Sequence, residues 1–309
     1  MNYSTVNGVK DIQVLLKEAA VYTGKIDGVW GTGTRDAVLK LFHGCRLPTA
    51  GGQTTLVSIS AGSDFAGAKD GIMGIQSNLK LFQLYTGAVD GLMGPGTFKG
   101  FYAAFVAYRK ANKLPVYDLG WSKRVPGIFT QRVKQWCDAK GYWANAAHGL
   151  MGCMSFESGN TFSPSKQNNG GAKYFGLIQF GDAACQDLAK FLKDPSITLE
   201  AVKAMSQMDQ LELVFKYFAM WESRGKVYKR MEDFYLTIFY PAAVGKGPDE
   251  VLFTKNSDVP IIAKSYLQNN GFDLDKDGAI TVGEICTRVS QAYYDGLDPA
   301  NRNILSVAA

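Results

Sequence analysis

Histidine is scarce in this chain, and its cysteines lack the spacing of metal sites or disulfide frameworks. The two histidines are His43 and His148, with no HxH or HxxxH pair. Because a catalytic zinc ion usually takes two or three histidines from one site, a zinc amidase or peptidase is nearly excluded. The five cysteines form no CxxC pair, which argues against disulfides and favours synthesis in a reducing cytoplasm. Cys153 with His148 leaves a cysteine protease formally open, although a buried thiol is the simpler interpretation.

Long apolar segments and strong charge are also missing. No stretch approaches the roughly 18 apolar residues of a membrane span, and the start, MNYSTVNGVK, lacks the apolar core of a secretory signal. We therefore expect no stable membrane insertion. The net charge of +5 is mild and favours an acidic surface such as the bacterial wall. Nucleic acid is not an expected partner, because no basic stripe is interleaved with aromatic residues.

A block of sequence that occurs twice is the first feature that is present. Residues 12–34 are IQVLLKEAAVYTGKIDGVWGTGT and residues 75–97 are IQSNLKLFQLYTGAVDGLMGPGT, with a constant offset of 63 positions. In the first copy, apolar residues at helical spacing are followed by an Asp27-Gly28 turn and by threonines suited to cap a second helix. The pattern predicts two helix–turn–helix repeats.

The shared core of the two copies, G-x-hydrophobic-D-G-x-x-G-x-x-T, resembles the small helical peptidoglycan-binding module of many wall hydrolases. The resemblance implies that residues 1–47 and 73–115 are peptidoglycan-binding repeats and that bacterial peptidoglycan is the partner. Residues 48–72, rich in Gly, Ser, Thr and Ala, are expected to be a linker.

Aromatic side chains are the candidates for wall contact in these repeats. Tyr22, Trp30 and Tyr85 could stack on a sugar or cover a peptide stem, with burial in the core as the equal alternative. Asp27 and Asp90 are expected only to brace their Asp-Gly turns. The second repeat is degenerate, since a methionine replaces the tryptophan, so it either binds weakly or only packs.

After about residue 116 the pattern becomes that of one mostly helical domain, extending to residue 309. Prolines and glycines between residues 112 and 127 mark its boundary, and no alternating strand pattern is convincing beyond it. We expect a mainly α fold, with two small helical repeats followed by an α-rich lysozyme-like domain. The predicted helices of that domain cover 129–140, 144–157, 182–193, 198–223, 231–239 and 282–294.

The helix expected over 144–157 is apolar on several sides and places Glu157 in its last turn, just before Gly159. Apolar neighbours such as Phe156 and Phe162, together with the negative end of the helix, would raise the pKa of this carboxyl group. A glycosidase needs such a group: a carboxylic acid still protonated near neutral pH that can donate to the leaving oxygen.

Three short segments carry a family resemblance. Glu157-Ser158 followed by GLIQ at 176–179 resembles the "ES … GLMQ" pair of soluble lytic transglycosylases and goose-type lysozymes. YPAAVG at 240–245 stands where that family has AYNxG, but its Asn is missing. The resemblance covers about residues 145–250. It implies Glu157 as general acid and later base, and substrate contacts from Ser158, Gln179, Tyr174, Phe175 and Tyr240.

The reaction implied by the resemblance needs no second carboxylate. Ser158 and Gln179 would hydrogen-bond N-acetyl groups, the substrate's own N-acetyl group or C6 hydroxyl would attack, and the product would carry a 1,6-anhydro ring. A two-carboxylate hydrolase would need an Asp or Glu about 5 to 9.5 Å from the acid. Asp182 and Glu222 are the nearest candidates by sequence context.

Residues 273–284, DLDKDGAITVGE, match the twelve-residue calcium loop of the EF-hand type. Its crowded carboxylates repel one another unless a hard cation neutralises them. One copy favours a structural Ca²⁺ over a regulatory sensor; a loop filled only at high calcium and an empty turn are the alternatives. No organic cofactor is expected. The predicted ligands are Asp273, Asp275, Asp277, Ala279 (backbone oxygen), Thr281 and Glu284.

These features together predict a phage-type endolysin that cleaves the β-1,4 bond between N-acetylmuramic acid and N-acetylglucosamine, as a lytic transglycosylase. A muramidase of the same fold and a non-catalytic wall-binding virion protein are the alternatives. We expect a monomer that stays in the host cytoplasm until its release to the wall, or that is carried in the virion.

Overall fold

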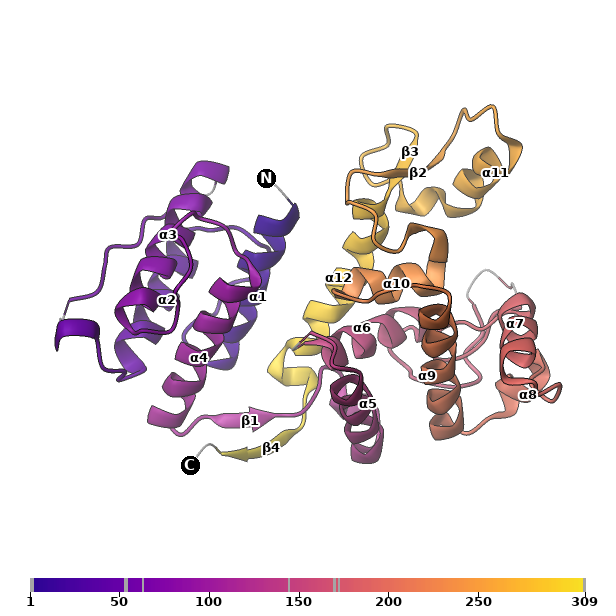
Figure 1. Ribbon diagram of the computed structural model, residues 1–309, viewed down its shortest axis with the longest axis horizontal. Coiled ribbons are helices and arrows are strands. Elements are labelled where there is room, and N and C mark those ends of the chain that lie inside the picture. Colours follow the sequence, from indigo (N-terminus) through magenta and orange to yellow (C-terminus); the bar gives the residue numbers. More distant parts are fainter. Residues whose placement is uncertain are drawn as a thin grey trace. The chain divides into compact units, whose positions relative to one another are not determined.

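The computed structural model describes residues 3–307 except 53, 54, 63, 144, 169, 170 and 172. This part of the chain is mainly helical with a few short strands, which confirms the α-rich fold class. Two compact units are present (Figure 1): unit 1 is Met1–Asp118 with Asp298–Ala309, and unit 2 is Leu119–Leu297. No helix among the described residues is long and apolar enough to span a membrane.

Four helices form unit 1 around a single core. The first helix pair lies within residues 3–44 and the second within residues 65–111. Buried residues of the two pairs pack together, among them Trp30, Phe42, Phe101 and Phe105. The predicted linker, residues 48–72, is not only a linker. Helix α3 (Phe65–Leu81) begins within it, and Ile59 is buried in the core. The helices are α1 (Tyr3–Glu18), α2 (Thr32–Gly44), α3 (Phe65–Leu81) and α4 (Pro95–Ala111), with 3₁₀ turns at Ala50–Gly52 and Pro299–Asn301.

The 63-residue offset of the sequence recurs in the hydrogen bonds of unit 1. Gln13 Nε2 donates to Asp27 Oδ1 at 2.9 Å, and that oxygen also accepts from the Val29 backbone at 2.9 Å. Gln76 and Asp90 repeat the first contact at 2.8 Å. Both aspartates therefore brace their turns, as predicted, and a glutamine that the sequence analysis had not singled out holds each of them.

The last residues of the chain complete unit 1. Strand β4 (Ile304–Val307) pairs antiparallel with β1 (Pro115–Tyr117). The buried Arg302 guanidinium forms an ion pair with the buried Glu18 carboxylate. The sequence analysis places Arg302 and residues 304–307 in the domain 116–309. In the structure they belong to unit 1, where the ion pair joins Arg302 to the first helix.

Unit 2 is arranged around α6 (Ala146–Ser158). This helix packs against α5 (Gly127–Lys140), α10 (Met231–Phe239) and α12 (Val282–Leu297) (Figure 1). Strands β2 (Val251–Thr254) and β3 (Ala279–Thr281) pair antiparallel in a two-stranded sheet. The helices are α5 (Gly127–Lys140), α6 (Ala146–Ser158), α7 (Asp182–Leu192), α8 (Leu199–Ala204), α9 (Gln207–Ser223), α10 (Met231–Phe239), α11 (Pro260–Asn269) and α12 (Val282–Leu297), with 3₁₀ turns at Ser122–Arg124, Pro241–Ala243 and Asn270–Phe272.

The predicted helices of this unit are mostly found, and the structure differs from the prediction in two respects. The helix expected over 198–223 is two helices, because Met205 is extended and the Ser206 hydroxyl caps α9 by accepting from the Asp209 backbone at 3.1 Å. The sequence analysis does not predict helix α11 or the β2–β3 sheet. Residue 144, the expected start of the Glu157 helix, lies outside the described residues.

Candidate functional site

Glu157 is the penultimate residue of α6, a helix whose residues are nearly all buried. Gly159 ends the helix in the left-handed conformation at φ 59°. The fully buried Ser158 hydroxyl donates to the Met154 carbonyl at 2.7 Å and accepts from the Phe162 backbone at 2.9 Å. Ser158 thus fixes the turn after the acid. Its hydroxyl is not available for the substrate contact that the resemblance implies.

Removal of the Glu157 carboxyl from water raises its pKa from 4.5 to about 7, and a hydrogen bond from the Tyr235 hydroxyl partly offsets that rise. The residue as a whole keeps some exposed surface. Burial also raises the pKa of Tyr235 well above its usual value, so the phenol stays a donor. At neutral pH a substantial fraction of Glu157 is therefore protonated and able to donate a proton.

Tyr235 is a site residue that the sequence analysis does not identify. It lies on α10, is 1% exposed, and its ring stacks on Phe239 at 6.0 Å and meets Phe156 edge-on at 5.5 Å. A tyrosine inside an apolar helix needs a hydrogen-bond partner for its hydroxyl. That need was the available signal, but it does not say which residue is the partner.

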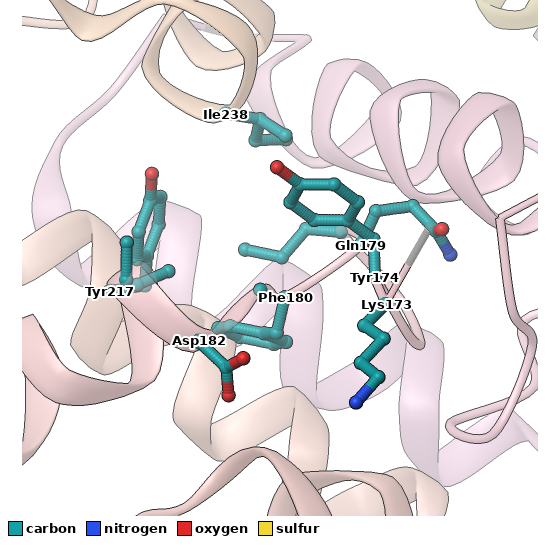
Figure 2. A pocket seen from close by; sticks show the side chains of 11 residues that line it. Lys173, Tyr174, Gln179, Phe180, Asp182, Tyr217 and Ile238 are labelled. Carbon is teal, nitrogen blue, oxygen red and sulfur yellow. The ribbon is translucent and has the colours of Figure 1, made fainter. Parts of the chain in front are cut away.

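A pocket of about 380 Å³ lies beside the YFGLIQF segment. Its volume is within the usual range for small-ligand sites. Figure 2 shows the rings of Tyr174 and Tyr217 on either side of it. Glu157 is not part of the lining. Its hydrogen-bond partner Tyr235 lies on α10, the helix whose Ile238 is part of the lining. The lining includes Lys173, Tyr174, Gln179, Phe180, Asp182, Tyr217 and Ile238.

Gln179 lines the pocket with one unused acceptor. Its backbone is left-handed at φ 55°. Nε2 donates to the Lys166 and Gly176 carbonyls at 3.0 and 3.1 Å, whereas the buried Oε1 has no partner among the described residues. A buried amide oxygen without a partner is costly. A ligand N–H would satisfy it, which fits the acetamido contact expected of this residue.

The other predicted contact residues separate into exposed and buried ones. Tyr174 is 48% exposed and its ring lies against Gly181, so it offers a flat surface to the pocket. Phe175 is buried with the Lys203 ammonium over its ring, and it does not line the pocket. Tyr240 packs on Phe253 with ring centroids 5.3 Å apart, away from the pocket lining.

The two candidates for a second carboxylate also differ. Asp182 lines the pocket at the start of α7. Glu222 accepts from the Lys140 ammonium at 2.5 Å and from the Tyr142 hydroxyl, and it is not among the lining residues. Asp182 therefore stays a candidate, and Glu222 has a structural partner instead.

The cysteine protease alternative does not fit the structure. Cys153 has no exposed surface, and burial raises the pKa of its thiol well above the usual value. Because the thiolate is the nucleophile in such enzymes, a thiol of this kind is inert. His148 accepts a hydrogen bond from the Gly120 backbone through Nδ1 at 3.0 Å.

The aromatic candidates of unit 1 contribute to its fold. Trp30 has no exposed surface and donates from Nε1 to the Ser60 carbonyl at 2.8 Å, so it cannot stack on a sugar. Tyr22 and Tyr85 are partly exposed, and their hydroxyls close their own turns by donating to the Lys25 and Ala88 carbonyls. The core alternative is correct for Trp30.

The loop 273–284 brings three aspartates together. One ligand atom each from Asp273, Asp275 and Asp277 lies within 4.8 Å of the others. Asp273 is 2% exposed, and its Oδ1 has no hydrogen-bond partner among the described residues. Glu284 closes the loop by accepting from the Leu274 backbone at 2.7 Å. Oxygen ligands of this charge and spacing suit a hard divalent cation.

Aromatic contacts connect this loop to the Glu157 region. Phe272, which precedes Asp273, meets Phe239 with ring centroids 5.3 Å apart. Phe239 stacks in turn on Tyr235, the hydrogen-bond partner of Glu157. The loop and the hydrogen-bond partner of Glu157 thus contact the same phenylalanine ring.

Comparisons with known proteins leave the site to be interpreted from its own chemistry. A scan against protein-family models found no match, and a search of curated proteins found none either. The features with the clearest chemical meaning are the raised pKa of Glu157 and the buried, unpaired amide oxygen of Gln179, a residue that lines the pocket.

Proposed function

We propose that this chain cleaves the β-1,4 bond between N-acetylmuramic acid and N-acetylglucosamine in bacterial peptidoglycan, with Glu157 as general acid. The observation that carries the proposal is the Glu157 carboxyl, whose pKa burial raises to about 7 and whose hydrogen-bond partner Tyr235 lies on α10, the helix that contributes Ile238 to the pocket. A non-catalytic virion protein would have no use for a buried acid, because burying a carboxyl without function only costs stability. The biological role proposed is that of a phage-type endolysin acting as a monomer.

The side chains near the pocket suggest how such a reaction would proceed. Glu157 protonates the leaving oxygen of N-acetylglucosamine while the muramic acid ring becomes oxocarbenium-like. Tyr174 supplies a flat surface for a sugar ring, and Gln179 Oε1 accepts from an acetamido N–H. The ionised Glu157 then takes the proton of the C6 hydroxyl as that oxygen bonds to C1. The result is a 1,6-anhydro end without consumption of water.

Mass spectrometry of the products tests the transglycosylase step. Purified peptidoglycan digested with this chain should release muropeptides lighter by one water than the products of a hydrolase. Muramidase activity is the second candidate, since Asp182 lines the pocket and could direct a water molecule. Reducing ends that depend on Asp182 would establish the muramidase and exclude the anhydro route.

Tyr235→Phe tests the hydrogen bond to the acid. The bond favours ionised Glu157 and lowers its pKa, so its loss should raise that pKa. Because cleavage needs the protonated acid, the alkaline limb of the rate profile should move to higher pH, by about one unit for a single charge-assisted bond. The pH dependence of muropeptide release measures this shift; an unmoved limb would show that Tyr235 does not act on the acid.

We also propose that Ca²⁺ binds at Asp273, Asp275 and Asp277 and holds the β2–β3 sheet against α10. Ca²⁺ at 100 times its dissociation constant should stabilise unit 2 by about 2.7 kcal/mol, or raise its Tm by roughly 5–10 °C. Calorimetry with Ca²⁺ and with a chelator measures the shift. Asp273→Asn should abolish it, and an equal response of that variant would contradict the site.

A further inference from the structure

Helix α4 presents a stripe of apolar side chains that begins at Phe98, which packs against the core of unit 1, and continues to two exposed residues. Tyr102 is 45% exposed and Val106 is 47% exposed, and they follow the partly buried Phe98 in successive steps of four residues. Such residues share one helix face. The Phe98 and Tyr102 rings are stacked, with centroids 6.5 Å apart and planes at 26°. We call Phe98, Tyr102 and Val106 the α4 stripe.

The matching face of the first helix pair shows that the stripe is not part of the shared framework. The two helix pairs repeat the same glutamine-centred hydrogen bonds. Yet α2 has Arg35, Leu39 and His43 at the three positions 63 residues earlier. These hydrogen bonds therefore form in the first helix pair without aromatic residues at those positions.

The charged residues of the α4 segment are of one sign. Between residues 91 and 117 the chain has four basic residues and no acidic one. Lys99 is exposed one turn before Tyr102, and Lys110 is exposed at the next four-residue step after Val106. In the first helix pair the position of Lys99 is Asp36, whose carboxylate pairs with Arg35 at 2.6 Å. An anionic polymer would therefore be attracted to α4 and not to the matching face of α2.

From this combination we infer that the α4 stripe is a binding surface for the glycan strand of peptidoglycan. The exposed Tyr102 ring stacks on a sugar face, Val106 widens the apolar contact, and Lys99 and Lys110 meet the carboxylates of the stem peptides. The identity of the glycan rests on the proposed function. The wall-binding surface is then in the second helix pair, whose sequence motif is the degenerate one, and not at Trp30.

Sedimentation of the intact chain with purified sacculi tests the surface. Glu157→Gln is present in every sample so that the sacculi are not digested. Tyr102→Ser should weaken binding about fivefold or more, within the range of one aromatic contact, and Tyr102→Phe should restore it to within about twofold because the ring is kept. Val57→Ser, which removes another apolar side chain of unit 1 with 41% exposure, is the matched control.

A second ligand separates stacking from charge. Chitin is an uncharged polymer of N-acetylglucosamine, so Tyr102→Ser should weaken binding to both polymers. The double change Lys99→Glu and Lys110→Glu should weaken binding to sacculi alone. Thermal melting of each variant reports whether unit 1 stays folded.

Several results would overturn the inference. These are a parent chain that does not sediment with sacculi, a folded Tyr102→Ser variant that sediments like its parent, and a Val57→Ser variant that loses as much binding. Cleavage is measured separately on the chain with Glu157 intact. Binding that depends on Tyr102 without any cleavage removes the proposed activity but leaves this surface in place, whereas cleavage with Tyr102-independent sedimentation does the reverse.

Discussion

Glu157→Gln is expected to slow the release of glycan fragments from purified peptidoglycan about 10³-fold, the middle of the range for loss of a general acid. Glutamine has nearly the shape of glutamic acid but cannot give up a proton. The pocket and Gln179 remain, so binding of sacculi should be unchanged. The rate of muropeptide release, measured at pH 6 to 7 where the acid is partly protonated, checks this result.

The same variant, although expected to be nearly inactive, should be more stable than the parent at high pH. The folded-state pKa of Glu157, about 7, lies above its ordinary value of 4.5. Between these values the folded chain holds a proton that the unfolded chain has lost, so stability declines as pH rises from about 4.5 and the decline ends above about 7. Glutamine does not titrate. Above pH 8 the variant should therefore melt at a higher temperature than the parent. Its free energy of unfolding should be larger by an amount on the order of 1–3 kcal/mol, once partial exposure of the residue is discounted.

The matched control is Glu200→Gln, which makes the same chemical change at an exposed position in the first turn of α8. Its cleavage rate and pH dependence of melting should equal those of the parent. A Glu157→Gln variant that cuts within tenfold of the parent rate would remove Glu157 from the mechanism. A variant that is inactive but shows no gain in stability at high pH would mean that the carboxyl is solvated in the folded chain.

Much of the helix content and the position of the acid could be predicted from the sequence. Apolar spacing identifies α6, and its glycine stop leaves Glu157 in the last turn, where burial is expected. The braces at Asp27 and Asp90 follow from Asp-Gly turn chemistry alone. These features depend on neighbours in the chain, which a linear pattern contains.

Features that depend on partners distant in the chain could not be predicted. Periodicity shows that Tyr235 is buried, but only the packing of α10 against α6 brings its hydroxyl to Glu157. Trp30 and Tyr102 illustrate the same limit from opposite sides. The aromatic residue within the motif is core and the one outside the motif is exposed, because side-chain exposure is decided by neighbouring helices and not by the motif.

Gly176→Ala is expected to cost unit 2 about 4 kcal/mol or more and to abolish cleavage. Gly176 has φ 89°, and a Cβ there would lie 2.1 Å from Gln210 Oε1. Gln210 is fully buried; it accepts from the Leu177 backbone at 2.7 Å and donates to the Pro164 and Val202 carbonyls at 2.9 Å. An alanine would displace this amide and leave several buried groups unpaired, at about 1–3 kcal/mol each, in addition to about 1–2 kcal/mol for the backbone.

Gly245→Ala separates the two causes. Gly245 has the same φ of 89°, but nothing lies within 4 Å of a Cβ built there. It should lose only the backbone contribution, about 1–2 kcal/mol, and so melt within several degrees of the parent, whereas Gly176→Ala should melt at least about 10 °C lower. Equal losses in the two variants would mean that Gln210 does not hold the loop. In that case the position of Gln179 in the pocket would depend on other contacts between its loop and α9, such as the edge-on packing of Phe180 against Tyr217.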